Sequence, residues 1–405
     1  MEEGKKSRNG KFSAAASAVG YLYQCRFGLL QSLDRLKKSF EFKISFELLD
    51  DVEFEEEGKP IELLQTKHHL NSAANLTDAS PDLWNTLRVW SEGKRNGDIP
   101  EDALLFLITT AVAPQGSAAF YLKPDTASRN VEAAEQHLVA TAQSSTNQSL
   151  QKAITAFKAL TDEQRKALIE SITVLDASPS IQELDELLRE AVFGFAPREH
   201  SASFLQRLEG WWYQQAVRQL AAPQRQPILG EELEDETSRL REQFKEDSLP
   251  IDDDILEAII DENAYQDRVF VEQLRLILVN QPRIVHASRN YYRAFEHRSR
   301  WTREELLLVG DLERYEKKLL EEWDLRFAQM KDDLGEEATE QMKVKAAEAL
   351  YRWIETGAHA RIRQNVTEPS IARGTYQILS DRGKVGWHHD FAERLKHLLS
   401  DRRAA

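Results

Sequence analysis

The sequence has a single cysteine, Cys25, among 405 residues, and it contains no long apolar run. One cysteine excludes an internal disulfide framework and is typical of a reducing cytoplasm. No stretch approaches the roughly 20 apolar residues that a membrane-spanning helix needs. The N-terminal segment is charged and polar, without the apolar centre of a signal peptide. We therefore expect a cytoplasmic protein with no membrane segment.

Positive charge is also scarce. Lysine and arginine number 53 against 68 aspartates and glutamates, which gives a formal net charge of −15 at pH 7. This balance argues against a protein that coats nucleic acid by bulk attraction. It does not exclude a nuclease, because metal ions can offset carboxylates locally. The length suits two domains, and no TPR-like or ankyrin-like repeat is present.

The most informative pattern lies near the N-terminus. The stretch KISFELLDDVEFEEEGKP begins at Lys43, is rich in β-branched and aromatic residues, and ends in a turn signal before IELLQTKHH. We predict a β-hairpin with strands at about 43–55 and 60–68. Because side chains alternate along a strand, Gln65 and Lys67 share one face with apolar residues. A buried lysine is costly unless an anionic group meets it.

The first strand of this hairpin offers that anionic group. Strict alternation puts Glu47 and Asp51 on one face, whereas Asp50 points the other way unless a bulge intervenes. An acid followed across a hairpin by an amide, one residue and a lysine is a nuclease pattern. Asp51 and Glu47 would bind Mg²⁺, for which Mn²⁺ can substitute, and Gln65 would add an oxygen ligand. Lys67 would stabilise the charge that develops on the scissile phosphate.

A plainer interpretation of the same residues stays open. Most Q-x-K patterns lie at solvated strand ends, and paired acids before an acidic run are common on exposed edges. His68 is either structural or directed at a substrate, because adjacent histidines on a strand point to opposite faces and cannot easily share one ion. Spacing alone does not separate a nuclease site from a solvated strand end.

The residues before the hairpin add a resemblance. The stretch GYLYQ, residues 20–24, lies in an amphipathic helix for which Ser17 is the expected N-cap. The order GYLYQ, FELLDDV and LLQTKH resembles the endonuclease domain of CD-NTase-associated (CBASS) effectors, within the restriction-endonuclease-like PD-(D/E)XK superfamily. The resemblance implies that Asp51 is the metal acid and Glu47 the upstream acid. It places the Q-x-K pair at Gln65 and Lys67, and a helical glutamine at Gln24. Asp50 and His68 are further accessory candidates. Gln65 stands where the superfamily often has a carboxylate, which leaves the number of metals open.

Further patterns predict an α/β core. ALLFLITTA, residues 103–111, and SITVLD, residues 171–176, are short apolar runs typical of buried strands. Helical patterns lie at about 131–142, 147–170 and 180–192. Strands that alternate with helices predict a mixed sheet flanked by helices. We therefore expect an endonuclease-like domain at 1–200, followed by a connecting helix and linker at 201–230.

From 231 to 405 the sequence predicts an all-α domain. Its helical patterns cover 255–281, 283–330 and 336–364, and the second breaks near Ser299-Arg300, with Thr302 capping the next helix. The stretches NYYRAFEHRSRWTREELLLVGDLERYEKKLLEEW and GTYQILSDRGKVGWHHDF resemble the C-terminal domain of ABC-three-component systems. Those are bacterial anti-phage cassettes that join an effector to an SMC/Rad50-like ATPase and a third subunit. An endonuclease-like domain ahead of this helical domain resembles the nuclease subunit of Lamassu systems.

These resemblances imply a function and a set of partners. The chain would be a Mg²⁺-dependent endonuclease that cuts double-stranded DNA once the ATPase partner senses aberrant DNA or DNA ends. We expect a dimer or tetramer in the active state. Candidate partner-docking residues are Trp301, Tyr315, Trp323 and Trp387, although aromatic residues at helical spacing usually pack a core. Two alternatives are a non-catalytic scaffold that binds nucleic acid and a stand-alone Mrr-type restriction enzyme.

Overall fold

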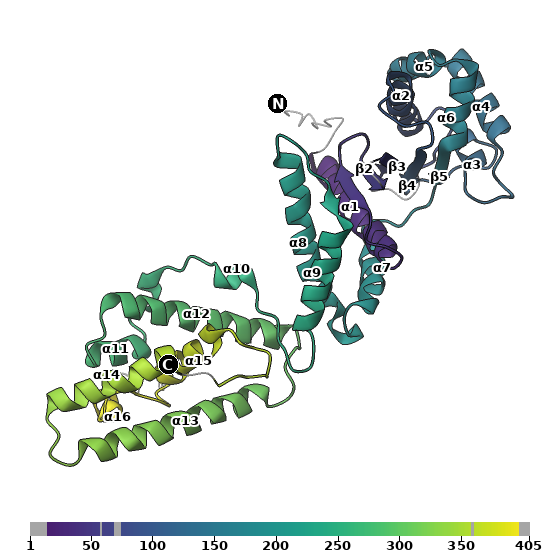
Figure 1. Ribbon diagram of the computed structural model, residues 1–405. Helices are drawn as coiled ribbons and strands as arrows, with labels where there is room; N and C mark the ends of the chain where they lie inside the picture. The colour runs from purple at the N-terminus through teal and green to yellow at the C-terminus, as the bar shows by residue number, and fades with distance from the viewer. Residues whose placement is uncertain (1–13, 57–58, 69–73, 358–359, 397–405) are drawn as a thin grey trace, which may run out of the picture. The chain divides into compact units, whose positions relative to one another are not determined.

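A computed structural model describes residues 14–56, 59–68, 74–357 and 360–396 of the chain (Figure 1). The chain divides into two compact units, Met1–Leu240 and Arg241–Ala405. The first unit combines a mixed sheet with helices, and the described part of the second is helical. The predicted fold class, a mixed sheet flanked by helices followed by an all-α region, is confirmed.

A six-stranded sheet forms the centre of the first unit, in the order β5-β4-β3-β2-β1-β6. β3 pairs antiparallel with β2, as do β2 with β1 and β1 with β6. β4 pairs parallel with both β3 and β5. Its strands are β1 (Lys43–Phe46), β2 (Val52–Glu56), β3 (Lys59–Lys67), β4 (Leu104–Thr109), β5 (Ile172–Leu175) and β6 (Ile228–Leu229). The strands predicted at 103–111 and 171–176 are confirmed, and β6 was not predicted.

The predicted hairpin is wrong in one respect. The segment 43–55 is not a single strand, because β1 and β2 pair with each other and residues 47–51 turn between them. The Glu47 N–H donates to the Asp51 carbonyl oxygen at 3.2 Å and closes this turn. Glu47 has a left-handed φ of 53°. The alternation predicted for these acids therefore does not apply, and the turn was missed because ELLDD contains no glycine or proline.

The two faces of the sheet are covered by different helices. α1 (Ala14–Leu36) packs on the face that carries Leu64, and it starts before Ser17, which is therefore not its N-cap. The other face carries the main apolar cluster, which includes Leu63 of β3 and Trp84 of α2 (Pro81–Asn96). Leu63 and Leu64 thus point to opposite faces, as the alternation along the predicted strand requires. Further helices on this side are α3 (Ala118–Tyr121), α4 (Val131–Ser144), α5 (Gln151–Lys158) and α6 (Asp162–Ser171).

Three more helices complete the first unit, namely α7 (Glu183–Ala191), α8 (Ser201–Ala221) and α9 (Gly230–Gln243), the last of which ends just past Leu240. Arg26 of α1 binds Asp185 of α7 at 2.8 Å and Glu209 of α8 at 2.7 Å. Gln219 Oε1 of α8 accepts a hydrogen bond from the Phe46 N–H of β1 at 2.8 Å. The segment 201–230 is thus packed against the sheet and α1.

The second unit is built around α15 (Pro369–Asp381), whose residues from Ser370 onward are nearly all buried. Sequence patterns did not predict this helix. The remaining helices are α10 (Asp253–Leu256), α11 (Val269–Leu276), α12 (Gln281–Arg303), α13 (Asp311–Leu334), α14 (Glu340–Thr356) and α16 (Phe391–Arg394). The predicted break near Ser299 is wrong, because α12 continues to Arg303. Thr302 lies inside α12 and donates to the Arg298 carbonyl oxygen instead of capping α13.

No helix in the described ranges combines the length and the apolar character that crossing a membrane requires.

Candidate functional site

The predicted site residues gather where the turn 47–51 meets the end of β3. The register that pairs Val52 with Leu64 brings Asp51 beside this end of the strand. Asp51 Oδ2 accepts hydrogen bonds from the Thr66 N–H at 2.7 Å and from Thr66 Oγ1 at 3.0 Å. The carboxylate of Asp51 is therefore held on β3, next in sequence to Lys67.

Glu47 connects this turn with α1. Its carboxylate accepts a hydrogen bond from the Gln24 side chain and feels the charges of Asp51 and Lys67. Partial desolvation raises the pKa of Glu47 above its usual value, and Asp51 raises it further, whereas Gln24, Lys67 and Arg225 lower it. The structure thus brings Glu47, Asp51, Gln24 and Lys67 together from the turn, from α1 and from β3.

Lys67 is half-buried at the last position of β3. Its charge acts on both Glu47 and Asp50. No carboxylate among the described residues lies within ion-pair distance of its ammonium. An ammonium that is near acids but not paired with one keeps its hydrogen-bond donors available for another anion.

The Asp50 side chain connects the turn with α2. It is only 7% exposed, and its Oδ2 accepts a hydrogen bond from Trp90 Nε1 at 2.6 Å. Its Oδ1 accepts the backbone N–H of Asp51 at 2.9 Å. Burial raises the pKa of Asp50 from 3.8 to about 7, although the Trp90 hydrogen bond opposes this rise.

Gln65 and His68 lie on either side of Lys67 in the sequence. Continuing the β2–β3 register by one pair places Gln65 opposite Asp51, where its side chain is 6% exposed. The His68 ring lies 4.9 Å from the Tyr23 ring of α1, and its Nε2 accepts the Ile181 N–H at 3.4 Å. His68 therefore links the end of β3 to α1 and to the segment before α7.

Glu47, Asp51, Gln65 and Gln24 offer oxygen atoms of the kind that Mg²⁺ binds. Among the described residues, no group of three or more His, Cys, Asp or Glu side chains is placed to hold a metal ion. Mg²⁺ needs only one or two carboxylates, because water and phosphate complete its shell. The mutual repulsion of Glu47 and Asp51 is the kind that a cation relieves. Gln24 Oε1 is buried without a hydrogen-bond partner in the described structure, which leaves a carbonyl oxygen for an ion or a water. These residues fit a hydrated Mg²⁺.

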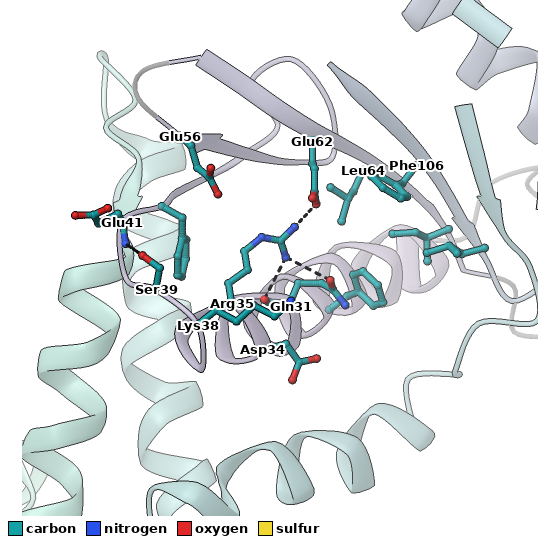
Figure 2. A pocket seen from close by; sticks show the side chains of 14 residues that line it. Gln31, Asp34, Arg35, Lys38, Ser39, Glu41, Glu56, Glu62, Leu64 and Phe106 are labelled. Carbon is teal, nitrogen blue, oxygen red and sulfur yellow. Dashed lines mark hydrogen bonds and ion pairs between the residues drawn. The ribbon is translucent and has the colours of Figure 1, made fainter. Parts of the chain in front are cut away.

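A cavity of about 440 Å³ lies between α1 and the sheet, apart from this cluster (Figure 2). Figure 2 shows Arg35 reaching across it from α1 to form an ion pair with Glu62 of β3. The Arg35 guanidinium also lies 3.7 Å from the centre of the Phe54 ring. None of the predicted site residues lines this cavity. Its size therefore does not mark the candidate site, which is identified by its chemistry.

The four candidate docking residues are all interior side chains of the second unit. Trp301 and Trp387 are 0% exposed, Tyr315 is 2% exposed and Trp323 is 9% exposed. Trp301 Nε1 donates to the Pro250 carbonyl oxygen at 2.8 Å, and Trp323 Nε1 donates to that of Gly386 at 2.9 Å. In this structure the four side chains pack the core, and a partner would meet other residues.

Two residues that hold the site were not predicted. Thr66 binds the Asp51 carboxylate, and Trp90 binds that of Asp50 from a helix 40 residues further along the chain. Thr66 lies inside the Q-x-K motif, so its position in the sequence could have identified it as a site residue. Trp90 had none, because nothing in a single sequence pairs a tryptophan on α2 with a turn acid.

Residues 270–395, from α11 to just beyond α16, match the family model for C-terminal domain 7 of the ABC-three component (ABC-3C) systems. A search of curated proteins found no match to the chain. The match supports the resemblance found for the C-terminal region, and it supports a role in such a defence system, with protein partners. It does not extend to the first unit. The helical region of the chain is therefore similar to the C-terminal domain of an ABC-three-component protein.

Proposed function

We propose that the chain is the Mg²⁺-dependent DNA endonuclease subunit of a Lamassu-type ABC-three-component system. One observation carries this proposal: Glu47, Asp51, Gln24 and Lys67 converge at the end of β3. Two acids, an amide and a lysine that has no ion-pair partner among the described residues are groups that metal-assisted phosphodiester hydrolysis uses. The similarity of residues 270–395 to an ABC-three-component domain supports the part of the proposal that assigns the chain to such a system.

Each residue then has a defined task. Glu47 and Asp51 hold the metal, with Gln65 and Gln24 as further oxygen donors. When bound, Mg²⁺ supplies Lewis-acid stabilisation and an activated water. Thr66 keeps the Asp51 carboxylate oriented through its two hydrogen bonds. Lys67 donates to the phosphate oxygens as negative charge builds up in the transition state.

In this proposal, the net charge of the chain and its protein partners control when the nuclease binds DNA. A chain with a net charge of −15 binds DNA weakly by itself, so a lone subunit is held idle. An SMC/Rad50-like ATPase, together with a third subunit, would present DNA or DNA ends to the nuclease. Cutting both strands would pair two sites in a dimer or tetramer.

The test is plasmid cleavage by the chain with the products of its neighbouring genes. Wild type is compared with Lys67→Ala and with Lys152→Ala, which removes an exposed lysine from α5. We expect cleavage that needs Mg²⁺, stops with EDTA, falls at least about 100-fold in Lys67→Ala and is unchanged in Lys152→Ala. Equal cleavage by all three proteins would reject the assigned role of Lys67.

A second candidate is a non-catalytic scaffold that binds nucleic acid. It is favoured by the absence, among the described residues, of a group of three or more metal-ligating side chains. DNA binding without cleavage, in the complete complex and with Mg²⁺ or Mn²⁺, would select this function. Cleavage by the isolated chain as fast as by the complex would instead select a stand-alone enzyme of the Mrr type.

A further inference from the structure

The turn that carries Glu47 and Asp51 is held by few contacts of its own. It has no glycine or proline to fix its shape, and Leu48 at its tip is 48% exposed. One backbone hydrogen bond, from Glu47 N–H to the Asp51 carbonyl oxygen, closes it at 3.2 Å. Arg225 also donates to the Glu47 carbonyl oxygen. A turn of this kind needs an anchor to keep two carboxylates in place.

Asp50 and Trp90 provide a buried connection between the turn and the rigid part of the unit. Trp90 is 0% exposed in the main apolar cluster, so its indole is fixed by packing. Its Nε1–H donates to Asp50 Oδ2 at 2.6 Å, and Asp50 Oδ1 accepts the Asp51 N–H at 2.9 Å. A fixed ring thus sets the position of Asp50, and Asp50 sets the backbone of Asp51.

A stability role alone explains this arrangement poorly. Burying a carboxylate in an apolar interior is unfavourable, and an apolar residue at position 50 would pack against α2 at less cost. What the carboxylate adds is a pair of directed hydrogen bonds, one to a helix and one to the backbone of the next residue. The same Asp51 is held a second time by Thr66, so two connections fix it from opposite sides.

We propose that Trp90 is a positioning residue for the metal site, acting through Asp50 on Asp51. This inference rests on the proposed nuclease function and deepens it. The connection makes the metal affinity of the turn depend on an indole N–H that touches neither metal nor DNA. Residues that hold a metal ligand in place without touching the metal typically change metal affinity or activity by about 10- to 100-fold when they are removed.

The test variant is Trp90→Phe, which removes the N–H, keeps an aromatic ring and neither adds nor removes an ionisable side chain. The structure offers a matched control on the same helix. Trp84 is also 0% exposed in the same cluster, and its Nε1 donates to the Asp78 carbonyl oxygen at 2.7 Å. Trp84→Phe therefore makes the same chemical change and the same small cavity, but it leaves the turn 47–51 alone.

Two readouts need no catalysis. Hydrogen exchange of peptides covering the turn 47–51, without metal, should be about 10-fold faster in Trp90→Phe and unchanged in Trp84→Phe. Mn²⁺ affinity, measured by electron paramagnetic resonance on the full chain, should fall at least about 10-fold in Trp90→Phe and less than about twofold in Trp84→Phe. In cleavage assays of the complex, added Mn²⁺ should restore the rate of Trp90→Phe.

The outcomes separate the two proposals. If Lys67→Ala and Asp51→Ala abolish cleavage but the two tryptophan variants behave alike in exchange and Mn²⁺ affinity, Trp90 is structural and this inference is wrong. If the Lys67 and Asp51 variants cut as well as wild type, the proposed function is wrong whatever Trp90 does. If both tryptophan variants lose folded structure, Asp50→Asn is measured in their place. Its amide puts an NH2 donor in place of one of the two carboxylate oxygens, which accept from Trp90 and from Asp51, so one of these two hydrogen bonds is lost. Unchanged exchange and Mn²⁺ affinity in Asp50→Asn would therefore also reject the inference.

Discussion

Glu53 is a buried acid whose ionisation should destabilise the first unit, and Glu53→Gln tests this. It is 1% exposed on β2, and its Oε2 has no hydrogen-bond partner in the described structure. Burial raises its pKa from 4.5 to about 7, and the charge of Glu55 adds to the rise. The folded state therefore holds this proton more tightly than the unfolded state does. Stability is lost as pH rises from about 4.5 to about 7, and the loss is constant at higher pH.

The size of the effect follows from the shift. A rise of this size corresponds to about 3 kcal/mol of unfavourable free energy once Glu53 is fully ionised. At pH 5 less than about 1 kcal/mol of it is expressed, because the unfolded group is then only partly ionised. Glutamine keeps the shape and never ionises. Glu53→Gln should therefore be more stable than wild type, by an amount that grows by about 2 kcal/mol between pH 5 and pH 8.5.

The assay is hydrogen exchange of peptides from β2, with EDTA present. At each pH the ratio of the exchange rates in the variant and in wild type cancels the intrinsic exchange rate. Relative to wild type, Glu53→Gln should gain about 30-fold protection between pH 5 and pH 8.5. Glu56→Gln, at an exposed position of the same strand, should show no pH-dependent gain. An equal ratio for Glu53→Gln at both pH values would refute the argument, because it would mean that folding does not raise the pKa of Glu53.

Four other changes have expected outcomes. Gly374→Ala on α15 puts a Cβ 1.8 Å from the Asn290 carbonyl oxygen and should destabilise the second unit by about 3 kcal/mol in calorimetry. Gly210→Ala on α8 meets no atom within 4 Å and should raise the melting temperature through about 1 kcal/mol of helix propensity. Arg26→Met leaves Glu209 without its arginine and leaves Asp185 with Arg189 alone, and it should cost about 2 kcal/mol, seen as faster exchange in α1 and α7. Mg²⁺ at about 100 times its Kd should stabilise the first unit of wild type by about 2.7 kcal/mol and should not stabilise Asp51→Ala.

Local patterns predicted much of the fold because each pattern reports one strand or helix. The apolar run at 103–111 became β4, and the alternation in IELLQTK put Leu63 and Leu64 on opposite faces as expected. α15 was missed because its sequence mixes apolar residues with a glycine and with serine, threonine and glutamine, which are typical of exposed segments but are buried here. β6 was missed because a strand of two residues is defined only by its partner β1.

The site shows the same limit. Motif spacing was enough to select Asp51 and Lys67 for the end of β3, because both lie close to one hairpin in the sequence. The turn 47–51 could not be read from ELLDD, since its geometry depends on Trp90 and on Arg225, which are distant in the chain. The orientation of the Asp50 side chain, in particular, depends on a distant residue. Its direction is set by Trp90, which follows 40 residues later in the chain, and no rule of strand alternation applies to it.

The charges at this turn also imply an order of events in the proposed reaction. Glu47, Asp50 and Asp51 lie within five consecutive residues, and Lys67 is the cation of β3 that acts on two of them. Two like charges about 6 Å apart repel by about 3 kcal/mol at an effective dielectric constant of about 20. A phosphate that approaches Lys67 therefore meets a repulsion similar in size to the attraction that the lysine offers. Only a bound cation reverses that balance, so metal binding has to precede productive DNA binding. In the proposed function, the acidity of the turn would then work in the same direction as the acidity of the whole chain, because both would oppose DNA binding until the complex is assembled.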